Sequence, residues 1–214
     1  MAQYILFDLD GTLTDPGEGI TKCVAHALSH FGVDVTDLTH LYPFIGPPLK
    51  VSFQTFYGFD EESAYRAIQL YRERFAAVGW QENIPYPGIA DLLSELVHHG
   101  KTLLVATSKP EEFAVKILEH FDLAKYFTHI CGAPMDETIH STKATVIADA
   151  LQRCGITDVS DAIMVGDRLH DIEGAHENGL TAIGVLYGYG DRAEHEACGA
   201  DRIASTIEEL GQLL

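Results

Sequence analysis

The segment from residue 4 to residue 15 constrains the fold of this chain more than any other. An apolar run typical of a buried strand, Tyr4–Phe7, ends in two aspartates one residue apart, Asp8 and Asp10. Strand side chains alternate between faces, so both carboxylates point the same way and repel each other unless a cation lies between them. The pattern predicts Mg²⁺ chemistry on a phosphate, with one aspartate as nucleophile and the other as proton donor. The simpler alternative is a strand that ends in solvated aspartates.

Further apolar runs predict a parallel sheet. Strands are expected at Tyr4–Phe7, Thr102–Ala106, Ala162–Val165 and Thr181–Leu186, and a helical pattern follows each run after polar or glycine residues. This alternation is typical of βαβ units and predicts an α/β fold with a doubly wound parallel sheet. The expected helices of this part are Ile89–His98, Glu111–His120, Lys143–Arg153 and Asp171–Asn178.

The pattern changes between the first two strands. Residues 16–86 read as an α-helical insertion, with amphipathic helices at Gly19–Phe31, Leu49–Tyr57 and Glu61–Ala77 and no β-branched strand run. Prolines interrupt the helical pattern at residues 43, 47 and 48, and prolines at residues 85 and 87 mark its end. We therefore expect a core of residues 1–15 and 87–214, with a helical cap domain inserted at residues 16–86.

Two more polar clusters follow predicted strands, and ligands of open α/β sheets bind at the carboxyl ends of the strands. Thr107 and Ser108, followed by Lys109, offer hydroxyls and a helix start that suit the oxygens of a phosphate. The alternative role for either hydroxyl is an ordinary helix N-cap. Asp167 follows the next strand and is expected to reach a cation shared with Asp8. Asp171 supports that site or caps its own helix.

Lys143 opens a helix after the loop Ala133–Thr142, where its charge would balance a nucleophile and a phosphoryl group, although surface lysines at helix starts are common. The eleven histidines show no ligand spacing for zinc. Gly188-Tyr189-Gly190 predicts a turn near the rim of the site, without a chemical role.

Net charge and cysteine content limit the expected binding partners and the cellular location of the protein. The chain has 14 Lys and Arg against 32 Asp and Glu, a net charge of −18, which disfavours nucleic acid and anionic membranes. Its four cysteines lie far apart and are expected to be free thiols. With no signal-peptide pattern and no apolar run long enough to span a membrane, we expect a soluble, cytoplasmic protein, either monomer or homodimer.

Taken in order, these clusters resemble the haloacid dehalogenase superfamily. Asp8-Leu9-Asp10-Gly11-Thr12 resembles its first motif, Thr107 the second, Lys143 the third and Gly166-Asp167…Asp171 the fourth. The helical insertion is similar to the C1-type cap of the branch that contains phosphoglycolate phosphatase and β-phosphoglucomutase. One departure is that Ala144 and Thr145 follow Lys143, where many relatives have proline.

The resemblance implies roles for single residues. Asp8 would form an aspartyl-phosphate, and Asp10 would protonate the leaving oxygen and then activate water. The predicted catalytic residues are Asp8, Asp10, Thr107 and Lys143, and the predicted Mg²⁺ site comprises Asp8, Asp10, Asp167 and Asp171. The predicted substrate-binding residues are Gly11, Thr12, Gly46, Ser108 and Lys109, with Gly46 in a loop of the cap. Contacts of Lys50 and His170 with substrate stay open.

The resemblance also implies a substrate class, a small phosphate monoester hydrolysed in the manner of phosphoglycolate phosphatase. A 5′-nucleotidase or a sugar-phosphate phosphatase fits nearly as well. A phosphomutase of the β-phosphoglucomutase type ranks lower. A phospho-acceptor signalling module ranks last, because such modules lack both the second aspartate and the helical cap.

Overall fold

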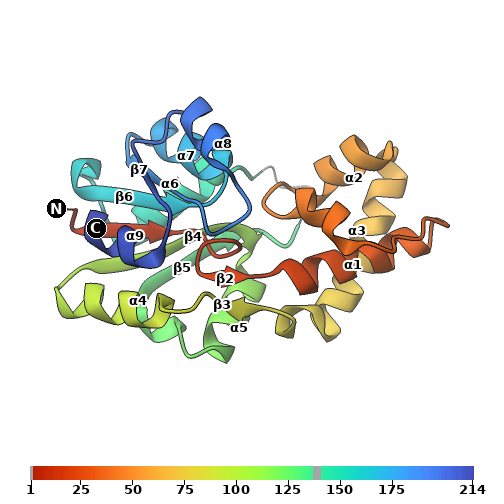
Figure 1. Ribbon diagram of the computed structural model, residues 1–214, viewed down its shortest axis with the longest axis horizontal. Coiled ribbons are helices and arrows are strands. Elements are labelled where there is room, and N and C mark those ends of the chain that lie inside the picture. The colour runs from red at the N-terminus through yellow and green to blue at the C-terminus, as the bar shows by residue number, and fades with distance from the viewer. Residues whose placement is uncertain (1, 137–140) are drawn as a thin grey trace. The chain divides into compact units, whose positions relative to one another are not determined.

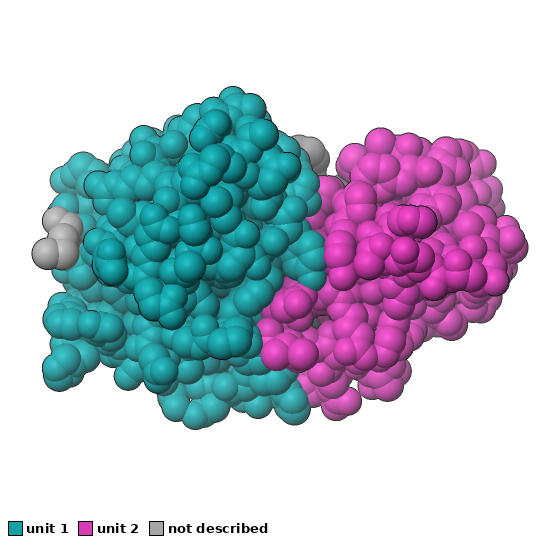
Figure 2. All heavy atoms as spheres, viewed as in Figure 1, with its two compact units in different colours: residues 1–14, 85–214 teal, residues 15–84 magenta. Residues whose placement is uncertain are grey.

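The computed structural model describes residues 2–136 and 141–214, so part of the predicted loop Ala133–Thr142 lies outside the described residues. The chain divides into two compact units (Figure 2). One unit comprises Met1–Thr14 and Pro85–Leu214, and the other comprises Asp15–Ile84. The short strands β2 (Thr14–Asp15) and β3 (Ile84–Pro85) pair where the chain passes from one unit to the other.

The first unit is built on a six-stranded sheet with the order β5-β4-β1-β6-β7-β8, in which every neighbouring pair is parallel (Figure 1). This confirms the predicted α/β class. Strand β1 lies between β4 and β6, and Phe7 is in register with Val105 and Val165. The first motif therefore leaves the middle of the sheet, between the strands that carry the second and fourth motifs. The strands are β1 (Tyr4–Phe7), β4 (Thr102–Pro110), β5 (Phe127–Ala133), β6 (Ala162–Gly166), β7 (Thr181–Val185) and β8 (Arg202–Ala204).

Helices α6 and α7 pack on one face of this sheet. Their apolar side chains, including Ile147 and Ile172, join Leu6, Leu104 and Met164 in one fully buried cluster. Burial of this apolar face is the main contribution that holds the two helices and the motifs at their starts in place. The helices of this unit are α4 (Ile89–His98), α5 (Glu111–His120), α6 (Lys143–Cys154), α7 (Leu169–Glu177), α8 (Arg192–Ala197) and α9 (Ile207–Leu213), with 3₁₀ helices at Ala124–Tyr126 and Val159–Asp161.

The structure corrects several predicted boundaries. Strand β4 continues to Pro110 instead of ending at Ala106. Helix α7 starts at Leu169, two residues before its predicted start, because the Asp171 carboxylate accepts a hydrogen bond from Arg168 N and so closes the first turn. Strands β5 and β8 and helices α8 and α9 were not predicted. Strand β5 lies at an edge of the sheet and buries only Cys131 fully, so it leaves no apolar run in the sequence.

The second unit is helical and has an aromatic core. Phe53 is fully buried, stacks on Phe59 and meets Phe44 edge to face. Two of its predicted helices match in both bounds, and the first starts and ends two residues before its prediction. The helices are α1 (Gly17–Ser29), α2 (Leu49–Tyr57) and α3 (Glu61–Ala77), with 3₁₀ helices at Leu38–Phe44 and Gly79–Gln81.

Two predictions about the whole chain are tested directly. All four cysteines are free thiols, as expected. Over residues 2–136 and 141–214, every helix is too short or too polar to cross a membrane.

Candidate active site

The two aspartates of the first motif lie directly beyond the central strand. Asp8 is buried, and its backbone N–H donates to Val165 O at 2.9 Å, which continues the pairing of β1 with β6. The turn that follows depends on Gly11, whose φ of +83° favours glycine. A Cβ on Gly11 would also lie 2.1 Å from Asp167 Oδ2. Glycine is therefore required here both for the turn and for the close approach of the fourth motif.

Three buried carboxylates meet at this end of the sheet. Asp8, Asp167 and Asp171 each offer an oxygen, and these three oxygens lie within 4.8 Å of one another. Burial, followed by the charges of Asp171 and Asp8, raises the pKa of Asp167 well above its usual value. Burial also raises the pKa of Asp171 to about 6, with Lys143 opposing and Asp8 adding to the rise. The cluster thus carries more negative charge than its surroundings stabilise.

Lys143 lies in this cluster. Its Nζ lies 2.8 Å from Asp8 Oδ1 and 2.8 Å from Asp171 Oδ1, and it donates to Ala106 O at 3.2 Å. Helix α6 begins at this lysine because the Thr142 side chain caps it. Burial alone would lower the pKa of Lys143, but Asp171 and Asp8 outweigh burial and raise it. The lysine is therefore a fixed cation between the first and fourth motifs.

A second lysine pairs with the second aspartate. Lys109 Nζ lies 2.5 Å from Asp10 Oδ2, and both side chains are largely buried. Burial raises the pKa of Asp10, and Lys109 counteracts part of that rise. The other oxygen, Oδ1, is buried and accepts no hydrogen bond from the part of the chain that the structure describes.

The hydroxyls of the second motif lie on the extended end of β4. Thr107 is almost fully buried and its Oγ1 accepts from Lys109 N at 3.2 Å. Neither Thr107 nor Ser108 caps α5, whose N-cap is Pro110 without a side-chain hydrogen bond. The N-cap alternative is therefore wrong, because the strand continues past both hydroxyls. In the first motif, Thr12 Oγ1 lies 3.5 Å from Asp167 Oδ1.

The sequence matches a known family over most of its length. The model of the family described as haloacid dehalogenase-like hydrolase matches residues 5–185, which include all four motifs. The chain belongs to this family. It is thus an enzyme of the hydrolase class, as the resemblance implied.

Relatives of this hydrolase carry several names. A 5′-nucleotidase of Pseudomonas aeruginosa is 46% identical over 98% of this chain and 94% of its own length. The tyrosine-protein kinase PtkA of Mycobacterium tuberculosis is 38% identical over 99% of this chain and 72% of its own length. A phosphoglycolate phosphatase of Agrobacterium fabrum is 35% identical over 89% of this chain and 83% of its own length. Among solved structures, a predicted phosphatase from Clostridium acetobutylicum has a TM-score of 0.96 and 49% identity, with 100% of this chain and 98% of that chain covered.

The carboxylate cluster of the hydrolase has the donor set that Mg²⁺ prefers. Hard divalent cations take oxygen ligands, and Mg²⁺ in proteins is commonly held by one or two carboxylates together with substrate phosphate. The raised pKa values of Asp167 and Asp171 show that their charged forms lack compensation, which a divalent cation would supply. The residues therefore fit Mg²⁺.

The loop after β7 makes contacts that the sequence did not predict. Tyr189 N donates to Asp167 Oδ2 at 2.8 Å, and the Tyr187 hydroxyl donates to Thr12 O at 3.2 Å. A Cβ on Gly188 would lie 2.3 Å from Gly11 O, so this loop packs tightly between the first and fourth motifs. The glycines of Gly188-Tyr189-Gly190 were the available signal, since paired glycines often mark a close backbone approach.

The remaining predicted residues are Gly46 and Lys50, in the other compact unit, and His170, on helix α7. Gly46 and Lys50 belong to the unit Asp15–Ile84, where Lys50 Nζ pairs with Glu61 Oε1 at 2.6 Å. The substrate contact of Gly46 stays a prediction. His170 follows Leu169 at the start of α7 and is half-buried; burial, followed by the charge of Arg168, lowers its pKa.

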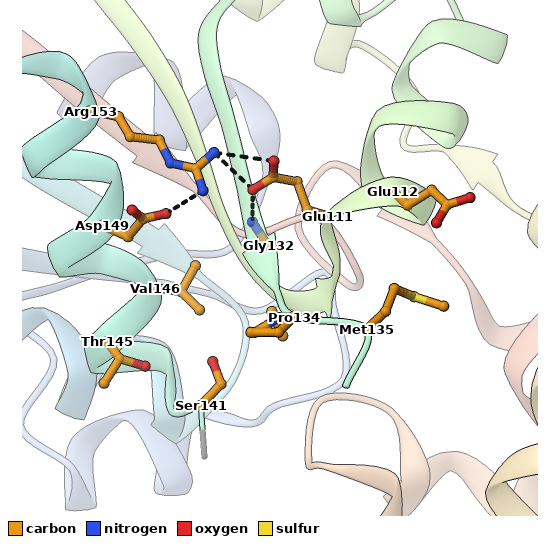
Figure 3. A pocket seen from close by; sticks show the side chains of 11 residues that line it. Glu111, Glu112, Gly132, Pro134, Met135, Ser141, Thr145, Val146, Asp149 and Arg153 are labelled. Atoms are coloured by element: carbon orange, nitrogen blue, oxygen red, sulfur yellow. Dashed lines mark hydrogen bonds and ion pairs between the residues drawn. The ribbon is translucent and has the colours of Figure 1, made fainter. Parts of the chain in front are cut away.

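A pocket in the unit that carries the sheet is formed by other residues (Figure 3). Among the described residues, its lining includes Glu111, Glu112 and Asp149 and a single cation, Arg153. Arg153 already pairs with Glu111 at 2.9 Å and with Asp149 at 2.7 Å, as Figure 3 shows. The described lining of this pocket includes no predicted residue of the four motifs, so the aspartate cluster is the better candidate for phosphate chemistry.

Proposed function

We propose that this hydrolase is a Mg²⁺-dependent phosphatase that cleaves small phosphate monoesters through an aspartyl-phosphate on Asp8. The observation that carries the proposal is the meeting of three buried carboxylates within 4.8 Å, with Lys143 paired to two of them. The family match and the names of the relatives support the same class of reaction.

Asp8 is the proposed nucleophile. Its Oδ1 accepts from Leu9 N at 2.7 Å and lies 2.8 Å from Lys143 Nζ, so we assign the attack on phosphorus to Oδ2. These contacts fix the orientation of the carboxylate before substrate binds, which lowers the entropic part of the barrier. When bound by Asp8 and Asp167, with the carbonyl of Asp10, Mg²⁺ would neutralise phosphoryl oxygens and orient the group for in-line attack.

Asp10 is the proposed acid and base. Burial raises its pKa, and a carboxyl that keeps its proton to higher pH is better suited to protonate the leaving alkoxide oxygen. The resulting carboxylate then removes a proton from the water that attacks the aspartyl-phosphate. Lys109, 2.5 Å from Asp10, lies where it can also meet the anionic oxygens of a substrate.

The proposed phosphoryl contacts come from the first and second motifs. The Thr107 hydroxyl and the backbone N–H groups near Gly11 and Thr12 would hold the equatorial oxygens, and Lys143 would balance their charge. Ser108 and Lys109 would extend these contacts toward the leaving group. We assign the choice of leaving group to the unit Asp15–Ile84, acting as a cap with Gly46 in its substrate loop.

The names of the relatives limit the range of candidate substrates. The 5′-nucleotidase shares 46% identity with the chain and the phosphoglycolate phosphatase 35%, so nucleoside 5′-monophosphates come first among candidate substrates and phosphoglycolate second. The kinase-named relative favours transfer to another acceptor as the second candidate function, because the same aspartyl-phosphate can pass its group to a hydroxyl instead of water.

The test is a phosphate-release assay across nucleoside monophosphates, sugar phosphates and phosphoglycolate, with Mg²⁺ or with EDTA. We expect free phosphate from at least one substrate with Mg²⁺ only, and loss of that activity in Asp8→Asn. Asp91→Asn is the matched control, since Asp91 is exposed on α4. Full activity of Asp8→Asn contradicts the proposal. A phosphorylated product without phosphate release supports the transferase instead.

A further inference from the structure

The loop that carries Asp167 forms hydrogen bonds with helix α8, which lies outside the four family motifs. Asp167 lies between β6 and α7, and Arg168 and Leu169 follow it directly. From within the motif, Asp171 Oδ2 accepts a hydrogen bond from Arg168 N at 3.1 Å. A further restraint on Arg168 and Leu169 comes from Glu194 on α8, about 25 residues further along the chain.

Glu194 binds both residues at once. Its Oε1 accepts from Arg168 Nε at 2.9 Å and from Leu169 N at 2.7 Å, and Oε2 lies 3.4 Å from Arg168 Nη2. The Arg168 and Glu194 side chains are only 17% and 22% exposed, so this pair is partly shielded from water. A carboxylate on the first amide of α7 satisfies a donor that the helix leaves without a partner, and it also suits the positive end of the helix dipole.

Glu194 is itself held firmly. Its backbone N–H donates to Asp191 Oδ1 at 2.8 Å, which fixes the start of α8. The next residue, His195, is fully buried and its Nε2 contacts Val185 O at 3.1 Å. The His195 ring lies so close to Gly184 that a Cβ there would be 2.6 Å from it. Helix α8 is thus anchored to β7, and the carboxylate projects from a rigid base.

We propose that Glu194 is a positioning residue for the metal ligand Asp167. Because Glu194 accepts hydrogen bonds from both the Arg168 guanidinium and the Leu169 amide, it fixes the backbone that orients the Asp167 carboxylate toward Asp8. The inference rests on the proposed Mg²⁺ function of the cluster, and it assigns to α8 a part in that function. Glu194 itself touches neither metal nor substrate.

The experiment is calorimetric titration of Mg²⁺ into the whole protein, together with phosphatase kinetics against Mg²⁺ concentration. Residues that orient metal ligands typically contribute about 10- to 100-fold to metal affinity. We therefore expect Glu194→Ala to raise the Kd for Mg²⁺ at least about tenfold. Saturating Mg²⁺ should restore most of kcat. Glu194→Gln, which keeps one acceptor oxygen for Leu169 N, should show a smaller loss.

Glu196→Gln is the matched control, because Glu196 lies on the same helix, is 62% exposed and pairs only with Arg192 among the contacts that the structure describes. We expect its Kd for Mg²⁺ to equal that of the wild type. If Glu194→Ala does not fold, Glu194→Gln is the variant that decides. Unchanged Mg²⁺ affinity in a folded Glu194 variant, even one with a lower Tm, overturns the inference. Absence of Mg²⁺ binding by the wild type instead overturns the proposed function.

Discussion

Replacement of Lys143 by methionine tests whether the buried cation stabilises the carboxylate cluster. Methionine keeps most of the apolar stem of lysine and removes the ammonium group. The side chain is only 4% exposed, and its Nζ lies 2.8 Å from both Asp8 Oδ1 and Asp171 Oδ1. Without it, the three carboxylates lose the cation that pairs with two of them.

The size of the effect follows from these distances. At an effective dielectric constant of 20, each contact at 2.8 Å contributes about 6 kcal/mol of attraction. Burying the charges costs several kcal/mol per ion, and removing one partner of a buried pair typically costs about 3–5 kcal/mol of folding free energy. For a chain of this size, a loss of 1 kcal/mol lowers Tm by about 2–4 °C. We therefore expect Tm to fall by about 6–20 °C in EDTA at pH 8.

The assay is thermal unfolding followed by circular dichroism, in EDTA and in saturating Mg²⁺. The deficit of Lys143→Met should shrink with Mg²⁺, because the metal replaces part of the missing positive charge. Lys125→Met is the matched control, since Lys125 is 53% exposed in a surface ion pair and should shift the free energy of unfolding by less than about 0.5 kcal/mol. A wild-type Tm for Lys143→Met in EDTA would show that Lys143 does not stabilise the carboxylate cluster.

Three further predictions concern the same cluster. The pKa of Asp171 rises from its usual 3.8 to about 6, so this carboxyl contributes stability below pH 4 that is lost as pH rises through about 6. In EDTA, Asp171 should account for a loss of about 3 kcal/mol of unfolding free energy over that range, and Asp171→Asn should make the pH profile less steep. Mg²⁺ at 100 times its Kd should stabilise the wild type by about 2.7 kcal/mol in chemical denaturation, and Asp167→Asn should abolish that gain while raising stability in EDTA. Gly188→Ala places a Cβ 2.3 Å from Gly11 O, so it should destabilise the fold by about 1–3 kcal/mol in the same assay; a wild-type denaturation midpoint contradicts this.

The sequence predicted the centre of the fold better than its edges. Strand β1 and helices α4 and α5 match their predicted bounds, because a strand buried on both faces and amphipathic helices impose clear apolar periods. Strand β5 was missed because an edge strand is half exposed, and its polar Thr128 and His129 interrupt the apolar pattern. Such a strand is recognised by its hydrogen-bonding partner, which no local pattern shows.

Contacts between distant parts of the chain were also missed in the candidate active site. Asp8, Lys143, Asp167 and Asp171 were predicted, and the structure brings their side chains together. The contact of Tyr189 with Asp167 was missed because it uses a backbone N–H, which every residue except proline carries. The pairing of Lys109 with Asp10 joins residues 99 positions apart, so only the neighbouring positions of β1 and β4 in the sheet explain it.

In the proposed mechanism, Asp8 carries a phosphoryl group during turnover. The most direct measurement quenches the enzyme in acid during steady hydrolysis of a phosphate monoester, reduces the acyl phosphate with borohydride and locates the modified residue by peptide mass spectrometry. We expect homoserine at position 8, formed with Mg²⁺ and absent with EDTA. Rapid phosphate release with Asp8 unmodified, or modification of a different residue, contradicts it.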